Sequence, residues 1–200
     1  MKVLPAILAK DMNDFNERLE KVYFTPLVQI DIADNKFVRN KTIQLYQIPK
    51  LKRKIELHLM IRSPENYLKE IIRIKPSSII IHKESTKRIS YIINELHKHK
   101  IKVGIAINPK TNVNVLFPYL KIADFFLIMT VIPGFYGSKF EHSSLNKIRI
   151  LRRKTKKDIE VDGHIDLETK KLVVKAGANV LVSGSYLFSN PKENYKLLKL

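Results

Sequence analysis

The chain of 200 residues contains no cysteine. Disulfides and thiolate metal sites are therefore excluded, and a reducing compartment is expected. Its longest apolar runs are far too short to span a membrane, so we expect no membrane partner. The apolar stretch Val3–Ala9 is interrupted by Pro5 and followed directly by Lys10 and Asp11, which favours a buried first strand over a signal peptide. We therefore expect a cytoplasmic protein.

Acidic residues are scarce, with 19 Asp and Glu against 37 Lys and Arg and a formal net charge of +18. Lysine outnumbers arginine about threefold, whereas nucleic-acid readers favour arginine. The densest basic run, residues 147–157, carries Ile148 and Leu151 at helical spacing, which is typical of a solvated helix with a buried stripe. No interleaved aromatics or nucleic-acid motif accompany it, so we expect no specific nucleic-acid binding. Attraction of anionic sugar phosphates is another use for the charge.

A hydrophobic content of 44% suffices for one compact domain over residues 1–200, and no linker or low-complexity segment divides it. Short continuous apolar runs alternate with helix-forming segments, a pattern typical of parallel strands buried on both faces. The predicted strands are Val3–Ile7, Leu27–Ile32, Ile55–Met60, Ser78–Ile81, Lys102–Ile107, Ala123–Met129, Asp158–Val161 and Val180–Ser183.

Helix signals lie between these runs. Gly177 is suited to end a helix, and a short helix is expected around Thr42–Gln47. Residues suited to open helices, two of them followed by a first-turn proline, are Asp11, Ser63, Ser85, Asp166 and Asn190.

Eight β/α units predict a TIM barrel, although 200 residues lie at the lower size limit for this fold. The competing fold is a doubly wound open sheet. It is less favoured because no glycine-rich dinucleotide fingerprint follows any of the predicted strands.

Three apolar runs end near an isolated side chain of a catalytic type, namely Asp31, His58 and Asp162. Polar groups are costly inside apolar strands unless they are paired. The two-residue period of a strand places all three in the barrel interior, at the strand ends where TIM-barrel active sites lie. Glu56 and Glu160 lie deeper on the same faces and are candidates for orienting the site. The alternative is a layer of hydrogen bonds inside the barrel, but three such strand ends favour an active site.

Eight segments match, in order and spacing, the motifs of one known family. They are Leu4–Leu8, Asp31–Val38, His58–Met60 with Pro64–Glu65, Ile81–Glu84, Gly104–Thr111, Met129–Phe135, Glu160–Gly163 and Val182–Phe188. Each motif alone is weak, but together they resemble ribulose-phosphate 3-epimerase almost end to end. The chain is identified as a divergent member of that family, which implies a TIM (β/α)8 barrel of the ribulose-phosphate-binding type.

The resemblance implies an isomerase of the pentose phosphate pathway that interconverts D-ribulose 5-phosphate and D-xylulose 5-phosphate. In that family one carboxylate removes the C3 proton, an enediolate forms, and a carboxyl group on the opposite face returns a proton. Asp31 and Asp162 match this catalytic pair. One divalent metal ion (Zn, Fe, Mn or Co) would polarise the carbonyl, with Asp31, His58, Asp162 and possibly Gln29 as its ligands.

The partner implied by the resemblance is a small ketose phosphate. Such barrels bind phosphate through backbone N–H groups after the last two strands, and the alternative for Gly184–Ser185 is an ordinary turn. The loop Ile132–Gly137 is a candidate lid. His82 resembles a family histidine near the site, whereas taken alone it would be an ordinary rim histidine. We expect a homo-oligomer. The residues expected to bind substrate or phosphate are His58, Met60, Met129, Gly134, Gly163, Gly184 and Ser185.

Departures from the family pattern cluster at the site. Gln29 replaces a metal-binding histidine, Ala6 a substrate-contacting serine, and His164 the second glycine of an Asp-Gly-Gly turn. Ile132 replaces an asparagine, and Tyr136 a glycine in the loop after the sixth strand. An amide oxygen can ligate a hard cation but is a poor substitute for imidazole on zinc or iron. The alternative function is therefore a non-catalytic or altered-specificity sugar-phosphate-binding protein.

Overall fold

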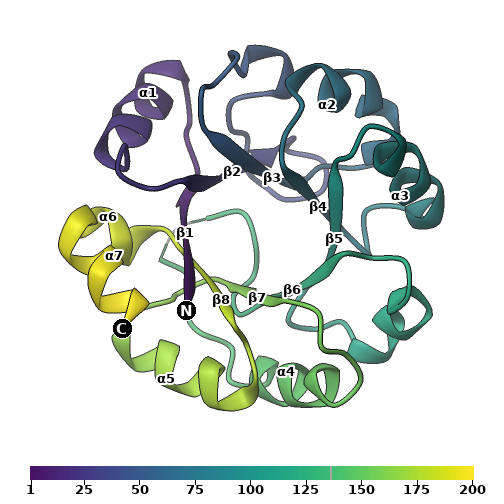
Figure 1. Cartoon of the computed structure of the whole chain (residues 1–200), viewed down its shortest axis with the longest axis vertical. Coiled ribbons are helices and arrows are strands. Elements are labelled where there is room, and N and C mark those ends of the chain that lie inside the picture. Colours follow the sequence, from purple (N-terminus) through teal and green to yellow (C-terminus); the bar gives the residue numbers. More distant parts are fainter. Residues whose placement is uncertain (136) are drawn as a thin grey trace.

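Eight parallel strands form a closed barrel in the computed structural model, which describes residues 1–135 and 137–200 (Figure 1). Neighbours in sequence are neighbours in the barrel, and β8 closes onto β1. This confirms the predicted TIM barrel. Tyr136, predicted to replace a loop glycine, lies outside the described residues. The strands are β1 Lys2–Ile7, β2 Leu27–Ala33, β3 Lys54–Met60, β4 Ser78–His82, β5 Lys102–Ile107, β6 Phe125–Met129, β7 Ile159–Asp162 and β8 Val180–Ser183.

Helices surround the barrel as an outer layer (Figure 1). The connection between β2 and β3 holds only the short 3-10 helix η1, close to where a short helix was predicted. The α-helices are α1 Met12–Lys21, α2 Leu68–Ile74, α3 Ile89–Lys98, α4 Ser144–Arg152, α5 Leu167–Ala176, α6 Ser185–Ser189 and α7 Pro191–Lys199. The 3-10 helices are η1 Leu45–Gln47, η2 Pro64–Tyr67 and η3 Val113–Tyr119.

Two of the predicted helix starts are confirmed. The Asp11 carboxylate accepts a hydrogen bond from the backbone N–H of Asp14 at α1, and Asp166 accepts two from the first turn of α5. Gly177 ends α5 with φ at 116°, a left-handed conformation that glycine adopts without strain.

Three other predicted caps were wrong. Ser63 adopts φ of 52° before η2 and makes no capping bond within the described chain. The Ser85 hydroxyl donates instead to the carbonyl of His82, and α3 starts only at Ile89. Asn190 likewise makes no side-chain cap at α7. Pro64 and Pro191 do lie in the first turn, where the fixed φ of proline favours a helix start by itself.

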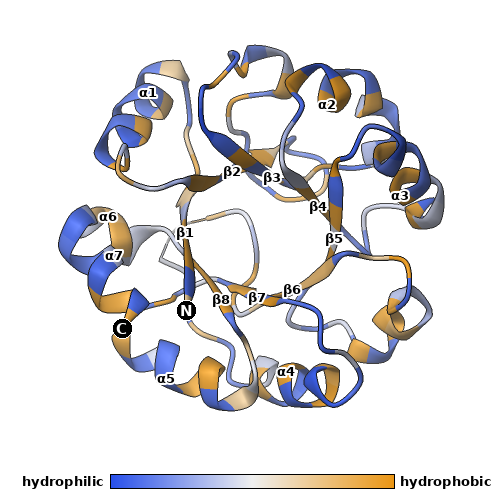
Figure 2. Cartoon of the chain, in the orientation of Figure 1, coloured by the Kyte–Doolittle hydropathy of each residue, from blue (hydrophilic) through white to orange (hydrophobic). Residues whose placement is uncertain are grey.

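Alternating side chains divide the core into two parts. Val28, Ile30 and Ile32 point outward from β2 into a large apolar cluster between the sheet and the helices, whose inner faces are apolar in Figure 2. The opposite faces of the strands point into the barrel, where they form two smaller apolar clusters. Gly104 is required there, because a Cβ at this position would overlap the ring of Phe125. This packing leaves the inward polar side chains, chiefly those of β2, β3, β4 and β7, as exceptions to an apolar interior.

The hydrogen-bond register positions the site. Asp31 on β2 lies opposite His58 on β3, and Asp162 on β7 lies opposite Met129 on β6. A slip of one residue would turn any of these side chains out of the barrel. None of the described helices is long and apolar enough to cross a membrane.

Candidate active site

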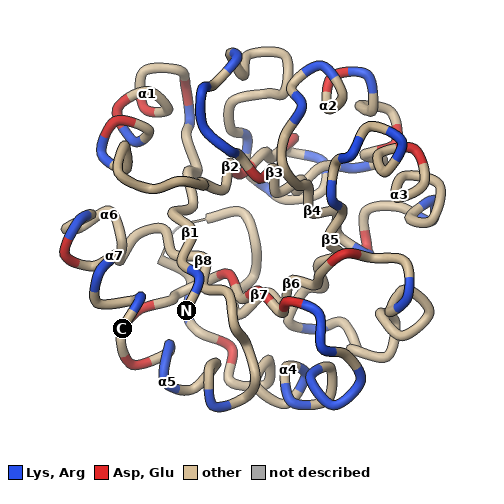
Figure 3. The backbone as a smooth tube through the Cα atoms, viewed as in Figure 1, with Lys and Arg blue, Asp and Glu red and all other residues tan. Residues whose placement is uncertain are grey.

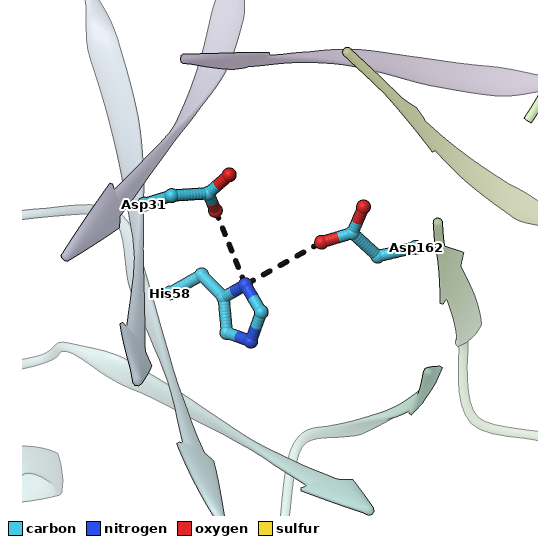
Figure 4. Close-up of side chains that lie close together, drawn as sticks. All are labelled: Asp31, His58 and Asp162. Atoms are coloured by element: carbon cyan, nitrogen blue, oxygen red, sulfur yellow. Dashed lines mark hydrogen bonds and ion pairs between the residues drawn. The ribbon is translucent and has the colours of Figure 1, made fainter. Parts of the chain in front are cut away.

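Asp31, His58 and Asp162 meet at the C-terminal end of the barrel (Figure 4). His58 Nδ1 lies 3.1 Å from Asp31 Oδ1 and 3.4 Å from Asp162 Oδ2. Along the closed sheet, β2 and β7 are separated by β1 and β8, so the two carboxyl groups approach the imidazole from different sides. The predicted convergence of the three residues is therefore observed.

Burial and the contacts among these three side chains determine which of them carry a proton. Burial disfavours a charged imidazole, but hydrogen bonds to Asp162 and Asp31 outweigh it and raise the pKa of His58 to about 9. Burial also raises the pKa of Asp31, against the hydrogen bond from His58. The imidazole is therefore protonated at neutral pH when no cation is bound, and it donates its Nδ1 proton toward the two carboxylates.

Gln29, two residues before Asp31 on the inward face of β2, lies at the centre of the group. Its Nε2 donates to Asp31 Oδ1 at 2.9 Å and to Asp162 Oδ2 at 3.1 Å, and lies 3.5 Å from His58 Nδ1. Its Oε1 is buried and has no hydrogen-bond partner among the described residues. The residue that replaces the family histidine is thus in direct contact with all three predicted site residues.

His82 at the end of β4 supports His58 from behind. The two Nε2 atoms lie 2.8 Å apart and the rings are stacked, with their centroids 5.0 Å apart. Burial lowers the pKa of His82, so this ring is neutral and can accept the Nε2 proton of His58. His82 was expected to be an ordinary rim histidine, yet it fixes which nitrogen of His58 faces the carboxylates.

Glu84 extends this chain and was missed by the sequence analysis. Its Oε2 lies 3.7 Å from His82 Nδ1, an ion-pair distance longer than a hydrogen bond. Partial burial opposes its charge, but the nearby His82 and hydrogen bonds from Thr111 and the backbone of Asn108 lower its pKa to about 2. Its sequence signals were its position two residues beyond the end of a strand and its place in the matching segment Ile81–Glu84, neither of which assigned it a role.

The donor set fits a divalent cation. Asp31, His58 and Asp162 each offer one ligand atom, and these atoms all lie within 4.8 Å of one another. Two carboxylate oxygens and one imidazole nitrogen suit Zn, Fe, Mn or Co, none of which requires a thiolate. The buried Gln29 Oε1 without a partner is a further oxygen atom close to this group.

All the residues predicted to bind substrate or phosphate line one cavity of about 50 Å³. Ligand pockets usually measure roughly 300–1,000 Å³, so the cavity in this conformation is closed around the acid groups. Ala6 also lines it, whereas Ile132 is 59% exposed and does not. The lining residues from the prediction are His58, Met60, Met129, Gly134, Gly163, Gly184 and Ser185.

The loop between β6 and α4 covers the cavity and is fastened on two sides. Asn40, in the connection after β2, donates to the carbonyl of Gly134. On the other side, His164 Nδ1 lies 3.1 Å from the carbonyl oxygen of Ser138. His164 has φ of 52°, a conformation that costs a histidine more than the glycine it replaces. The substitution therefore exchanges backbone freedom for a contact with the covering loop.

Glu56 and Glu160 do not orient the site as predicted. They lie at the opposite end of the barrel and line a separate cavity of about 480 Å³ with Ser78 and Phe125. The Ser78 hydroxyl donates to Glu56 at 2.6 Å, and the nearby Glu56 contributes to a raised pKa of Glu160. A strand residue two positions deeper lies about 6.6 Å below its neighbour on the same face, which is too far for a direct contact with a carboxylate at the rim.

The fold and the site together define a β/α-barrel protein with paired carboxyl groups in a cavity at the C-terminal end of its strands. Comparison with known sequences identifies the family to which it belongs. The chain belongs to the ribulose-phosphate 3-epimerase family, whose model matches residues 2–188.

Two relatives show the extent of the likeness. Ribulose-phosphate 3-epimerase of Bacillus subtilis (strain 168) is 35% identical over 200 residues, covering 94% of this chain and 92% of that protein. The enzyme of the same name from Schizosaccharomyces pombe is 32% identical over 204 residues, covering 96% and 90%. The predicted family is therefore confirmed.

Solved structures agree on the fold. A 3-hexulose-6-phosphate synthase matches with a TM-score of 0.72 at 16% identity, covering 100% of this chain and 98% of that one. A tryptophan synthase α-subunit from Pyrococcus furiosus matches with a TM-score of 0.69 at 18% identity, covering 99% and 94%. At these identities the likeness shows the barrel fold alone.

Proposed function

We propose that the protein interconverts D-ribulose 5-phosphate and D-xylulose 5-phosphate by inverting C3, with Asp31 and Asp162 as the acid–base pair. The carrying observation is that two carboxyl groups from separate strands face one small cavity at the C-terminal end of the barrel. Proton removal on one face of a carbon and return on the other requires such a pair. One group must be ionised while the other is protonated, and burial raises the pKa of Asp31 in the direction that favours its acid form.

A divalent cation held by Asp31, His58 and Asp162 would supply Lewis-acid stabilisation of the enediolate oxygens. The chain's own groups prepare this site. His82 holds the Nε2 side of His58, which leaves Nδ1 directed at the carboxylates. Metal binding must then displace the Nδ1 proton, so metal affinity should increase with pH.

Phosphate binding is assigned to the turns after β7 and β8. Gly163 has φ of 118° and packs against Val131 so closely that a Cβ would overlap that side chain. Gly184 and Ser185 form the start of α6 beside it. Because the closed cavity is too small for a pentose phosphate, the loop over Gly134 must move during substrate entry.

The test is C3 proton exchange in deuterated water, followed by proton NMR with D-ribulose 5-phosphate as substrate. Wild-type protein should exchange the C3 proton and form xylulose 5-phosphate. Asp31→Asn and Asp162→Asn should each reduce exchange by about 10²–10⁴-fold, because a general acid–base group is lost. Asp158→Asn, at the opposite rim, is the matched control and should retain exchange.

The absence of exchange by the wild-type protein with each of the metals Zn, Fe, Mn and Co would refute the proposed activity. Stoichiometric binding of the sugar phosphate without exchange would instead support the non-catalytic alternative raised by Gln29, Ala6 and His164.

A further inference from the structure

The amide nitrogen of Gln29 lies where a bound cation would lie. Gln29 is fully buried, and its Nε2 is within 3.5 Å of the three atoms that could ligate a metal. These are Asp31 Oδ1, Asp162 Oδ2 and His58 Nδ1, the atoms of the ion pairs in Figure 4. The amide oxygen is turned away and has no partner within the described chain. The amide thus satisfies the two carboxylates while its own acceptor is left unsatisfied.

Without a cation this orientation is the favourable one. An inward amide oxygen would oppose two carboxylate oxygens, whereas the NH2 group donates one hydrogen to each of them. A divalent ion at the same point reverses the preference, because it repels the N–H dipoles and attracts the oxygen. The terminal torsion of glutamine is broad and roughly two-fold, so the amide can turn over. Its side chain must also withdraw, because the cation takes the place that the nitrogen holds.

We propose that Gln29 has two working orientations: with nitrogen inward it holds the metal-free site together, and with oxygen inward it is the fourth metal ligand. The resulting set of three oxygens and one nitrogen suits Mn²⁺ better than a set with two imidazoles would, and suits Zn²⁺ less well. Gln29 therefore sets the relative affinity for these two ions. The inference rests on the proposed function only because the same centre would perform the chemistry.

The experiment measures binding of Mn²⁺ and of Zn²⁺ separately, by equilibrium dialysis of metal-stripped protein. Gln29→Met keeps the length of the side chain but removes its oxygen, and should weaken Mn²⁺ binding at least tenfold. Gln29→His should tighten Zn²⁺ binding at least tenfold and change Mn²⁺ binding by less than threefold. Asn13→His, on the exposed face of α1, adds a histidine elsewhere and should bind both ions as the wild type does.

Three results would overturn the inference: no Mn²⁺ binding by the wild type, unchanged Mn²⁺ binding by Gln29→Met, or an unchanged Zn²⁺ to Mn²⁺ affinity ratio in Gln29→His. Circular dichroism melting of each metal-free variant separates loss of the ligand from loss of the fold. If Gln29→Met does not fold, Gln29→Glu replaces it. That variant keeps an oxygen in either orientation and should bind Mn²⁺ at least as tightly as the wild type.

Dialysis involves no turnover, so the two proposals fail in different ways. Binding as expected with no C3 exchange would refute the proposed activity and leave the role of Gln29 standing. C3 exchange by the wild type together with no binding of Mn²⁺ in dialysis would refute the role of Gln29 and leave the proposed activity standing.

Discussion

Glu84 influences the active site without touching it. Its carboxylate accepts hydrogen bonds from the Thr111 hydroxyl and from the backbone N–H of Asn108. Its Oε2 lies 3.7 Å from His82 Nδ1. A carboxylate at that place favours a proton on His82 Nδ1, which leaves His82 Nε2 as an acceptor for His58. The chain of contacts therefore ends in a defined orientation of the His58 imidazole.

Glu84→Gln should weaken metal binding by about 10–100-fold, the usual effect of losing a partner of a ligating histidine. The maximal rate should fall with it, while the KM for the sugar phosphate changes little because Glu84 does not line the cavity. Metal titration and steady-state kinetics test this. The control is Glu20→Gln on the exposed face of α1. Metal affinity equal to the wild type would show that His82 is oriented without Glu84.

Among single residues, the sequence predicted those that stand out in the local pattern of apolar and polar side chains. Asp31, His58 and Asp162 were found because each is a polar residue at the end of an apolar run. Gln29 was recognised by its alignment with a family histidine, but the direction of its amide depends on two carboxylates far away in sequence. Glu84 was missed because its role depends on β4 lying beside β3, which brings His82 against His58.

The strands carry a second pair of carboxyl groups far from the chemistry. Glu56 on β3 and Glu160 on β7 face each other at the lower end of the barrel. Burial raises the pKa of Glu56 to about 7, and burial together with Glu56 raises that of Glu160 well above its ordinary value. Folding therefore takes up protons at these two positions near neutral pH.

This pair should make stability depend on pH. The pKa of such a carboxyl group is higher in the folded protein than in the unfolded protein. Its contribution to the free energy of unfolding is fully present below the unfolded pKa of 4.5, and it is lost as the pH rises through the folded pKa of about 7. Urea unfolding should show stability falling between pH 5 and pH 8. Glu160→Gln keeps a hydrogen-bond donor to Glu56 but takes up no proton, so it should be more stable than the wild type at pH 8 by on the order of 1–3 kcal/mol.

At pH 5 the two proteins should differ by much less, which separates proton uptake from a packing effect. Glu20→Gln again serves as the control and should parallel the wild type at both values. A wild-type curve that is flat between pH 5 and pH 8 would contradict the raised pKa values.

The presence of each strand and helix was more predictable than the residues at which it begins and ends. Apolar runs located all eight strands, with the largest shift at β6, which starts at Phe125 instead of Ala123. Caps were less predictable because serine and asparagine bond equally well to loop carbonyls, as Ser85 does with His82. The choice between cap and loop is made by tertiary contacts that a local pattern does not contain.

Over the whole molecule, the net charge of +18 is spread around the outer helices, as Figure 3 shows. The dense run of residues 147–157 is partly structural. Ile148 and Leu151 are buried as predicted, and Arg152 donates to carbonyls at Gly177, Thr155 and Lys157. The charge is therefore distributed over the outside of the barrel, where it is expected to give a broad positive field.

Such a field should attract an anionic substrate. We expect kcat/KM for D-ribulose 5-phosphate to fall about three- to tenfold between 20 and 200 mM salt, because screening shortens the reach of the field. The kcat should stay nearly constant, since the bound state is shielded from ions. Initial rates at both salt concentrations and several substrate concentrations test this. A parallel loss of kcat would point to an effect of salt on the site itself.

The closed barrel was predictable because eight β/α units can complete the sheet. The register between neighbouring strands was not predictable from the single strands. This register decides which residues lie at the same height along the barrel axis. That dependence limits how the site can vary. Insertion of one residue in the middle of β2 would turn Asp31 from the cavity to the helix layer. Replacement of Gln29 or Ala6, in contrast, leaves the register of the strands unchanged. The lineage of this chain can therefore alter its active site by exchanging side chains in place, but not by lengthening or shortening the strands that carry them.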